Sequence, residues 1–212
     1  DVYKRQNYIY SIDDFEVGDI IYDDPGNDNE EESGENSTAN ISVDDPLYSS
    51  QSNITSTNID DVWDQYTTGD GSQVVAILDS GGDYTHPDLE ANTWINTAEL
   101  NGVEDYDDDG NGYVDDIRGW DFINLDNAPL DDNMHGTHVA GIVGAVGNNG
   151  IGIAGAAWNV KLMHIKVFQS TGVGSSITIA EGVEYAYMNG ATILNMSFGS
   201  YAESFTLKLA LE

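Results

Sequence analysis

Apolar and polar residues alternate in blocks along this chain, and the blocks predict strands that alternate with helices. Residues 74–78 (VVAIL) are apolar throughout, which is typical of a parallel strand buried on both faces. Further strands are predicted at 160–168 and 191–196. This order predicts an α/β fold, a doubly wound and mainly parallel sheet with helices on both faces.

Three helices are predicted around these strands. Asn58 is expected to cap a short helix before the first strand. The second helix is predicted over 135–146, and the third over 177–188 with Ser176 as its N-cap. The apolar faces of the first and third helices are expected to hold Ile59, Val62, Trp63 and Tyr66, and Ile177, Ala180, Val183 and Tyr187, respectively.

Composition sets limits on the class of protein. The chain has 212 residues, 40% of them hydrophobic, which is enough for one sizeable core. It carries 38 acidic and 6 basic side chains, a net charge of −32 that argues against nucleic acid or an anionic membrane surface as a partner. Cysteine is absent, so disulfides and thiol chemistry are excluded. No apolar run approaches the ~20 residues of a membrane span.

The N-terminal part differs in composition from the rest. Residues 1–6 (DVYKRQ) hold two of the six basic side chains and resemble a translated transposon end, so we interpret them as a sequencing or fusion scar. Residues 13–45 carry thirteen acidic and no basic side chains, and 26–37 contain no apolar residue. Such a segment cannot bury enough surface to offset its ordering entropy, which predicts an acidic flexible linker. Residues 7–12, rich in tyrosine and isoleucine, are predicted to end an earlier unit as a strand.

Two motifs carry candidate chemistry. The first strand ends on Asp79, and His135 opens the second predicted helix. An aspartate followed by a histidine is two thirds of a charge relay in the order Asp…His…Ser, in which the histidine takes the proton of a serine and the aspartate fixes the imidazole tautomer. Two alternatives stay open: Asp79 caps a turn, or His135 and His138 bind zinc without an evident third ligand.

Three segments together point to a family. The segments 79–89 (DSGGDYTHPDL), 135–141 (HGTHVAG) and 195–199 (NMSFG) resemble three successive motifs of the subtilisin-like serine peptidases, of the thermitase and subtilisin type. The resemblance implies a secreted endopeptidase that hydrolyses peptide bonds with an Asp-His-Ser triad. It implies Asp79 as the relay carboxylate and His135 as the general base. Protein and peptide substrates and the enzyme's own propeptide are the implied partners.

The resemblance also organises the chain. It implies that 45–212 is the N-terminal portion of a peptidase domain, truncated on its C-terminal side, and that 7–44 is a propeptide remnant with the linker. The oxyanion-hole asparagine and the Gly-Thr-Ser nucleophile motif are expected beyond Glu212, so we expect this chain alone to be inactive. A pseudopeptidase without the serine remains an alternative. Gly82 replaces the apolar residue usual after the Asp-Ser-Gly, and we expect it to loosen the turn beside Asp79.

Two glycine-containing segments follow the second and third strands. In the family, the corresponding segments are extended edges that pair with the substrate backbone, which gives affinity without strict sequence choice. Glycine permits close backbone approach there, although ordinary turn glycines are the alternative. The implied substrate-binding residues are Gly172, Val173, Gly174, Ser197, Phe198 and Gly199.

The segment 105–116 (DYDDDGNGYVDD) fits a calcium-binding loop pattern. Carboxylates so close together repel one another unless a cation neutralises them. The predicted Ca²⁺ ligands are Asp105, Asp107, Asp109, the carbonyl of Asn111 and Asp116, with Asp115 as a rival for the last position. The alternatives are a solvated acidic loop, or a non-enzymatic calcium-binding module of the dockerin or adhesion type.

A second calcium site follows only from the resemblance. Thermitase-like members hold calcium with an aspartate near the N-terminus, the aspartate of a His-Pro-Asp-Leu segment and the loop after the histidine helix. The matching residues here are Asp45, Asp88, Asn149 and the carbonyls of Gly147, Ile151 and Ile153. Taken without the family, 147–153 is a turn rich in glycine and asparagine.

Overall fold

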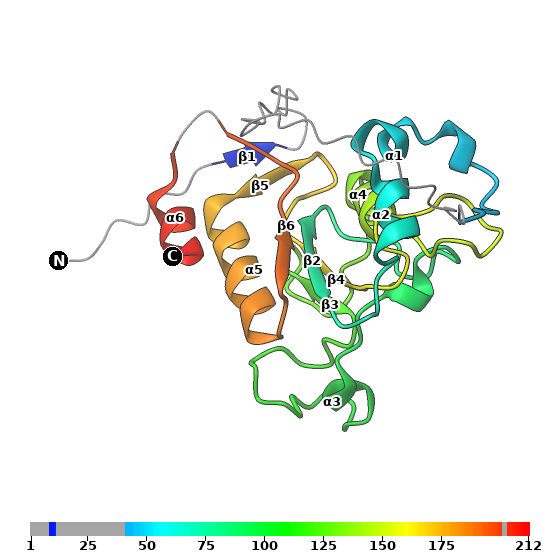
Figure 1. Ribbon diagram of the computed structural model, residues 1–212. Coiled ribbons are helices and arrows are strands. Elements are labelled where there is room, and N and C mark those ends of the chain that lie inside the picture. The colour runs from blue at the N-terminus through cyan, green and yellow to red at the C-terminus, as the bar shows by residue number, and fades with distance from the viewer. Residues whose placement is uncertain (1–8, 12–40, 201–202) are drawn as a thin grey trace.

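A parallel four-stranded sheet in the order β3-β4-β2-β6 forms the centre of the molecule (Figure 1). The structure is a computed structural model, and it describes residues 9–11, 41–200 and 203–212. The strands are β1 (Ile9–Ser11), β2 (Val74–Asp79), β3 (Gly119–Asp121), β4 (Lys161–Lys166), β5 (Val173–Ser175) and β6 (Ile193–Asn195). The α-helices are α1 (Ser52–Thr57), α2 (Ile59–Gln65), α3 (Thr97–Leu100), α4 (His135–Gly144), α5 (Ser176–Met188) and α6 (Phe205–Leu211), and Tyr48–Ser50 and Glu90–Asn92 form 3-10 turns.

The central strand β2 explains the layering. In β2, Val75 and Ile77 belong to the cluster that packs on α4, whereas Ala76 and Leu78 belong to the cluster that packs on α5. Successive side chains of a strand point to opposite faces, so an all-apolar strand needs a helix on each face. Figure 1 shows α5 and α4 on opposite sides of the sheet. The predicted α/β fold is confirmed.

The same alternation gives the α4 face a polar end. Asp79 follows Val75 and Ile77 on that face of β2. On β4, Leu162 packs in the same cluster, and His164 and Lys166 follow it at intervals of two residues. The carboxyl end of the sheet therefore presents three buried polar side chains towards α4.

Helix α5 differs in detail from its prediction. Its N-cap is Ser175 rather than Ser176, and Ser175 and Thr178 form a reciprocal capping box. The buried stripe runs through Ile179 and Val183, whereas Tyr187, predicted on the apolar face, is 81% exposed. The capping box fixes the start of the helix, and of the predicted apolar face only Val183 is among the buried residues.

The N-terminal helical region also differs. Asn58 lies in the left-handed conformation between α1 and α2, and its side chain makes no cap bond. Of the predicted apolar face, Trp63 is buried, where its ring packs on Trp158 with centroids 4.9 Å apart and its Nε1 donates to the carbonyl of Ala156. Val62 and Tyr66 are exposed. One tryptophan therefore anchors this short helix.

Parts of the N-terminal predictions lie outside the described residues. These are the scar over 1–6 and the linker up to residue 40. Residues 9–11 are described, and this strand, β1, pairs antiparallel with β5, with Ile9 opposite Ser175 and Ser11 opposite Val173. Among the described helices, none is both long enough and apolar enough to cross a membrane.

Candidate active site

Asp79 and His135 meet at the carboxyl end of β2. The Asp79 carboxylate is fully buried, and its Oδ1 lies 2.8 Å and its Oδ2 3.0 Å from Nδ1 of His135. The backbone N–H of Ser80 also donates to Oδ1, at 2.7 Å. The His135 side chain remains 31% exposed. Such a carboxylate can hold the imidazole in the tautomer that carries its proton on Nδ1, which leaves the other ring nitrogen as an acceptor.

Burial sets the protonation behaviour of Asp79. Desolvation raises the pKa of this carboxyl group, and the hydrogen bonds from His135 and Ser80 only partly offset the rise. The charged form of Asp79 therefore depends on its partners. Conversely, a buried carboxylate stabilises an imidazolium next to it more strongly than an exposed one does.

The close approach of α4 to β2 requires a glycine. A Cβ at Gly136 would lie 2.0 Å from the carbonyl oxygen of Gly81 and 3.1 Å from Cβ of Asp79. The backbone N–H of Gly136 donates to Oγ of Ser80 at 3.0 Å. Gly136 thus brings His135 within hydrogen-bond distance of Asp79.

Asp131 fixes the start of α4, and sequence reasoning missed it. Its carboxylate accepts bonds from the backbone N–H and hydroxyl of Thr137 and from the hydroxyl of Ser80. Burial raises the pKa of Asp131, but these bonds outweigh the effect and hold the pKa below its usual range. An aspartate just before a predicted helix start was the available signal.

Gly82 makes room for a buried imidazole, which corrects the expectation of a loosened turn. A Cβ at Gly82 would lie 2.0 Å from Nδ1 of His164. His164 is fully buried, and neither of its ring nitrogens has a hydrogen-bond partner among the described residues. Burial lowers the pKa of His164 to about 4, so the ring is neutral at pH 7. The turn beside Asp79 is therefore closely packed.

The two predicted substrate edges lie side by side. After β4, the chain turns at Gly172, and Phe168 forms a bridge with Gly174. Phe198, which follows β6, is buried against Phe168 with ring centroids 4.9 Å apart. Ser197 bonds to Asn195 at the end of β6, Val173 lies in β5, and nothing lies within 4 Å of a Cβ built on Gly199.

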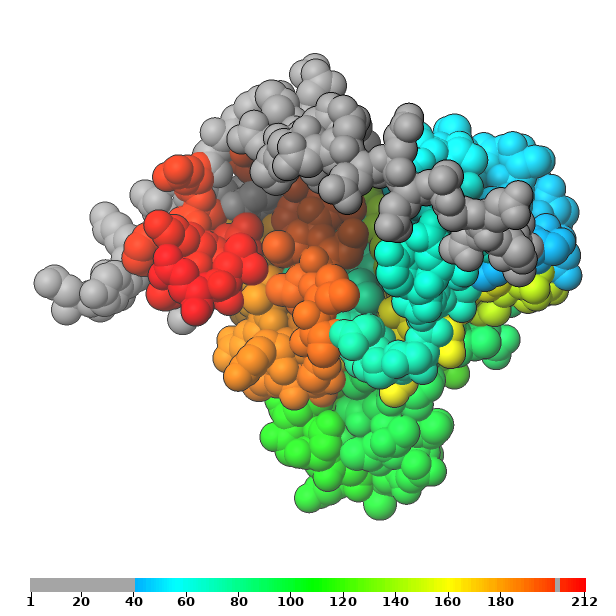
Figure 2. Space-filling view, in the orientation of Figure 1, coloured from blue at the N-terminus to red at the C-terminus, as the bar shows by residue number. Residues whose placement is uncertain are grey.

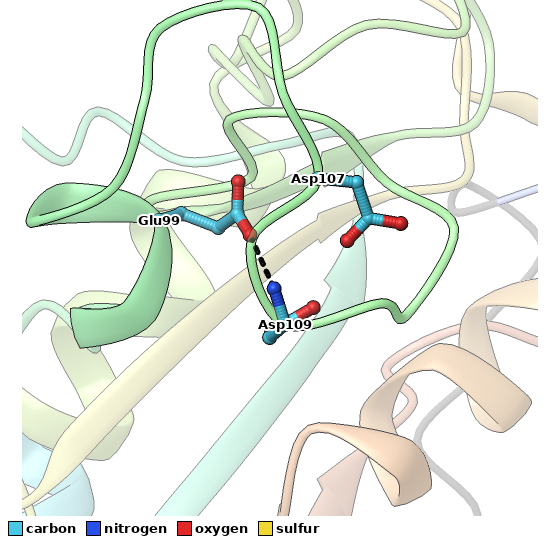
Figure 3. A group of neighbouring side chains, drawn as sticks. All are labelled: Glu99, Asp107 and Asp109. Carbon is cyan, nitrogen blue, oxygen red and sulfur yellow. Dashed lines mark hydrogen bonds between the residues drawn. The ribbon is translucent and has the colours of Figure 1, made fainter.

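The acidic segment forms a second candidate site, which could hold a metal ion. One carboxylate oxygen each of Glu99, Asp107 and Asp109 lies within 4.8 Å of the others. Figure 3 shows these side chains converging from α3 and the loop, with the N–H of Asp109 bonded to Glu99. Clustered carboxylate oxygens are the ligands that Ca²⁺ prefers. In the space-filling view, the green segment around this loop projects as a lobe below the sheet (Figure 2).

Backbone amides shape this loop before any ion is considered. The Asp107 carboxylate accepts hydrogen bonds from the backbone N–H groups of Gly110, Asn111 and Gly112. The Glu99 carboxylate accepts hydrogen bonds from those of Asp108, Asp109 and Asp115. Asp105 lies in the left-handed conformation, and its N–H donates to Asp115. Glu99 was not predicted as a ligand, because it lies outside the twelve-residue pattern.

Asp116 has a different environment from the other predicted ligands. It is fully buried, and its carboxylate accepts bonds from Tyr185 at 2.5 Å, Asn96 at 2.8 Å and Asn111 at 3.0 Å. Burial raises the pKa of Asp116 to about 6. These bonds tie the loop to α5 through Tyr185, and the role of Asp116 as a ligand stays a prediction.

The residues of the second predicted calcium site are brought together. Asp45 accepts the N–H groups of Asn148 and Asn149, and Asp88 accepts the side chain of Asn149 and the N–H of Ile153. Both carboxylates are buried. Gly147 and Ile151 belong to the same loop. Within the described part of the chain, however, only Glu99, Asp107 and Asp109 form an acidic or histidine cluster with metal-binding spacing. Among the residues that the structure describes, His135 and His138 therefore have no third ligand at metal-binding spacing.

Comparisons with known proteins agree with the motif resemblance. A family model described as the subtilase family matches residues 70–209. The chain is 44% identical over 124 residues to subtilisin-like protease 1 of Plasmodium falciparum (isolate 3D7), covering 58% of this chain and 18% of that protein. It is 32% identical over 149 residues to thermitase of Thermoactinomyces vulgaris, covering 70% and 44%, and 36% identical over 155 residues to halolysin of Haloferax mediterranei, covering 73% and 26%. The chain thus spans less than half the length of each of these relatives.

Proposed function

Because the chain belongs to the subtilase family, we propose that it is the N-terminal part of the catalytic domain of a serine endopeptidase. In this proposal, His135 is the general base and Asp79 is the relay carboxylate. The observation that carries the proposal is the 2.8 Å contact between Nδ1 of His135 and the fully buried Asp79 carboxylate. The family match over 70–209 includes the acidic loop, so we do not propose an adhesion module.

The chemistry follows from this pair. A serine hydroxyl is a weak nucleophile at neutral pH and needs a base within hydrogen-bond reach. With Nδ1–H bonded to Asp79, the other ring nitrogen of His135 takes the serine proton as the oxygen attacks the peptide carbonyl, and then returns it to the leaving amine. The serine then carries the acyl part of the substrate as an ester. In the second half of the reaction, water attacks this ester and releases the acyl group as a carboxylic acid. We propose that the serine and the oxyanion-hole asparagine follow Glu212 in a longer protein.

The substrate and the partners are proposed from the edge at β5. β5 accepts a second strand, because residues 9–11 pair with it in antiparallel register. An extended peptide bound in the same way gains main-chain hydrogen bonds without strict sequence choice. This supports protein and peptide substrates, and it supports the segment before residue 45 as a propeptide remnant. We also propose that the protein is secreted, as the family resemblance implies.

We further propose that Ca²⁺ stabilises the loop 105–116. The support is the convergence of Glu99, Asp107 and Asp109 on one point, together with the absence of any lysine or arginine from 96–116. A bound cation neutralises this loop and lowers the repulsion between its carboxylates. It has no part in the proton transfers. The Asp45 and Asp88 site is proposed as a second one on family resemblance.

The test uses a fluorogenic peptide and two forms of the protein. We expect the purified chain to give no turnover, and the natural protein that contains it to give turnover that Asp79→Asn and His135→Ala abolish. His138→Ala is the matched control, because His138 is exposed on the same helix. Turnover by the chain alone that His135→Ala removes would contradict the proposed need for a downstream serine. A natural protein that folds but lacks turnover would identify a pseudopeptidase.

A further inference from the structure

Lys166 is a buried cation next to the proposed active site. It is the last residue of β4, stands opposite Asp79 in the parallel register of β2 and β4, and is 1% exposed. Lysine is almost never fully buried unless it is paired, because an unpaired charge away from water is costly. This chain has only 6 basic side chains against 38 acidic ones. One of the six is buried at the carboxyl end of β4, beside Asp79.

The ammonium group has three partners. Nζ donates to the carbonyl oxygen of Ser80 at 2.7 Å, to the carbonyl oxygen of Phe168 at 3.1 Å and to Oδ1 of Asp132 at 2.5 Å. An ammonium has three N–H donors, so these contacts use all of them. The Asp132 carboxylate is half-exposed, and its contribution is therefore screened by solvent more than the two carbonyl contacts are.

Each partner belongs to a different part of the site. Ser80 follows Asp79, and its hydroxyl accepts the N–H of Gly136. Asp132 lies in the segment that leads into His135 at the start of α4. Phe168 begins the turn towards β5, the proposed substrate edge, and its N–H donates to the carbonyl oxygen of Asp79. One point charge therefore connects the aspartate strand, the histidine helix and the substrate edge.

We propose that Lys166 is a positioning residue, which holds Asp79, His135 and the β5 edge in register without touching the substrate. The inference deepens the proposed function and rests on it for its catalytic meaning. The contacts themselves do not depend on it. An apolar side chain of equal length would fill the space but would release the Ser80 and Phe168 carbonyls and Asp132 from their common donor. The segments that carry His135 and Asp79 would then lose this connection and keep the bonds that Asp79 and Ser80 make to His135, Gly136 and Asp131.

The absence of cysteine makes a chemical test possible. In Lys166→Cys the single thiolate is alkylated in denaturant with 2-bromoethylamine, where sulfur displaces bromide and restores a side chain that ends in an ammonium. 1-Iodopropane, from which sulfur displaces iodide, gives a neutral apolar side chain of the same length at the same site. Both products are refolded and compared by NMR through the Nδ1–H resonance of His135 and the hydrogen exchange of the Gly136 amide. The Nε1–H resonance of Trp63, bonded to Ala156 away from the site, reports that the chain is folded.

The neutral product is expected to lose the His135 Nδ1–H resonance and to exchange the Gly136 amide proton roughly tenfold faster or more. A factor of about ten in an equilibrium constant is the least that we expect from losing a hydrogen bond to a charged group. The aminoethyl product is expected to restore both. Lys161→Cys, treated in the same way, is the matched control, because Lys161 is exposed at the other end of β4. It is expected to change neither reporter.

A folded neutral product with an unchanged His135 resonance and unchanged Gly136 exchange would overturn the proposal. If the neutral product does not refold, Asp132→Ala removes one acceptor of the ammonium at a half-exposed position. A change in the two reporters supports the proposal, and unchanged reporters overturn it. Neither reporter requires peptide hydrolysis. A natural protein without turnover therefore refutes the proposed function and leaves Lys166 as the residue that aligns the pair, while unchanged reporters refute only the role of Lys166.

Discussion

The Asp79–His135 pair and the acidic loop 105–116 hold charged groups in opposite ways. Asp79 is buried and His135 is partly buried, with Gly136, Ser80 and Lys166 packed around them. The loop gathers carboxylates of one sign at an exposed lobe, supported mainly by its own backbone amides (Figure 2).

The difference shows where each site obtains its counter-charge. The pair finds its partners within the fold, because the sheet and α4 bring segments from distant parts of the sequence together. The loop contains no basic residue between 96 and 116, and none of the ion pairs among the described residues involves it, so we propose that a cation from solution neutralises it. We therefore expect the pair to respond to packing and the loop to respond to cations.

The largest expected effect comes from one glycine in each region. Gly136→Ala places a Cβ 2.0 Å from the Gly81 carbonyl and should lower the free energy of unfolding by at least about 3 kcal/mol, which outweighs the ~1 kcal/mol that alanine gains in helix propensity. Gly110→Ala has open space and a φ of +73°, so the strain should cost only about 1 kcal/mol. Urea denaturation of both variants measures the difference. Equal losses would contradict the contrast between a packed and an open region.

The second effect is a pH dependence centred on His164. Burial lowers its pKa from the ordinary value of 6.5 to about 4, although the charges of Asp131 and Asp83 act in the opposite sense. The unfolded chain therefore binds this proton more readily, and stability is lost as the pH falls from about 6.5 to about 4, by up to about 3 kcal/mol. Denaturation of the chain across this pH range should show the loss, and His164→Leu should remove it.

A second titration has the opposite sign and serves as the internal reference. Burial raises the pKa of Asp116 to about 6, so its protonation below that pH favours the folded state. The unmodified chain and His164→Leu both contain Asp116. The difference between the pH dependences of their free energies of unfolding therefore isolates the contribution of His164. An identical slope in His164→Leu would show that the imidazole is not buried in its neutral form.

The third effect concerns calcium. At a Ca²⁺ concentration about 100 times the dissociation constant, a site that exists only in the folded state adds about 2.7 kcal/mol to the free energy of unfolding. Glu99→Gln should remove most of this increment, whereas Glu104→Gln, an exposed matched control, should keep it. Denaturation with Ca²⁺ and with a chelator measures both. If Glu99→Gln keeps the increment and Asp116→Asn loses it, the original twelve-residue pattern is the better description.

The smallest effect tests the connection between the loop and the core. Tyr185→Phe removes the hydroxyl that donates to Asp116 at 2.5 Å, and it should cost about 1–2 kcal/mol, because Asn96 and Asn111 continue to donate to the same carboxylate. Tyr187 on the same helix is 81% exposed, so Tyr187→Phe should change the free energy of unfolding by less than about 0.5 kcal/mol. Thermal unfolding of both variants checks this. Indistinguishable melting temperatures would mean that the loop is not anchored through Tyr185.

Much of the fold could be predicted from local patterns. The apolar run 74–78 predicts a doubly buried strand because side chains alternate and the helices cover both faces. The start of α5 and its buried stripe were less predictable, since Ser175 and Ser176 are chemically equivalent as caps and packing on the sheet decides which residues are buried. The short strands β3 and β5 depend on neighbours that are distant in sequence.

The candidate site divides in the same way. The motifs around Asp79 and His135 predict a contact because each side chain stands at the end of a regular element. Asp131, Glu99 and Lys166 were missed, since each acts through segments that no short motif includes. Gly82 was misinterpreted for the same reason, because the His164 ring that it accommodates lies on another strand.

The sequence by itself determined the order of β2, α4, β4, α5 and β6, the excess of negative charge and the identity of the two motifs, because these depend on periodicity, composition and local spacing. Only the tertiary structure decided that Lys166 lies beside Asp79, that Gly82 makes room for His164 and that Glu99 joins the acidic loop. The physical reason is that hydrogen bonds and steric contacts act over a few ångströms. Residues far apart along the chain come within that range only after the sheet has formed.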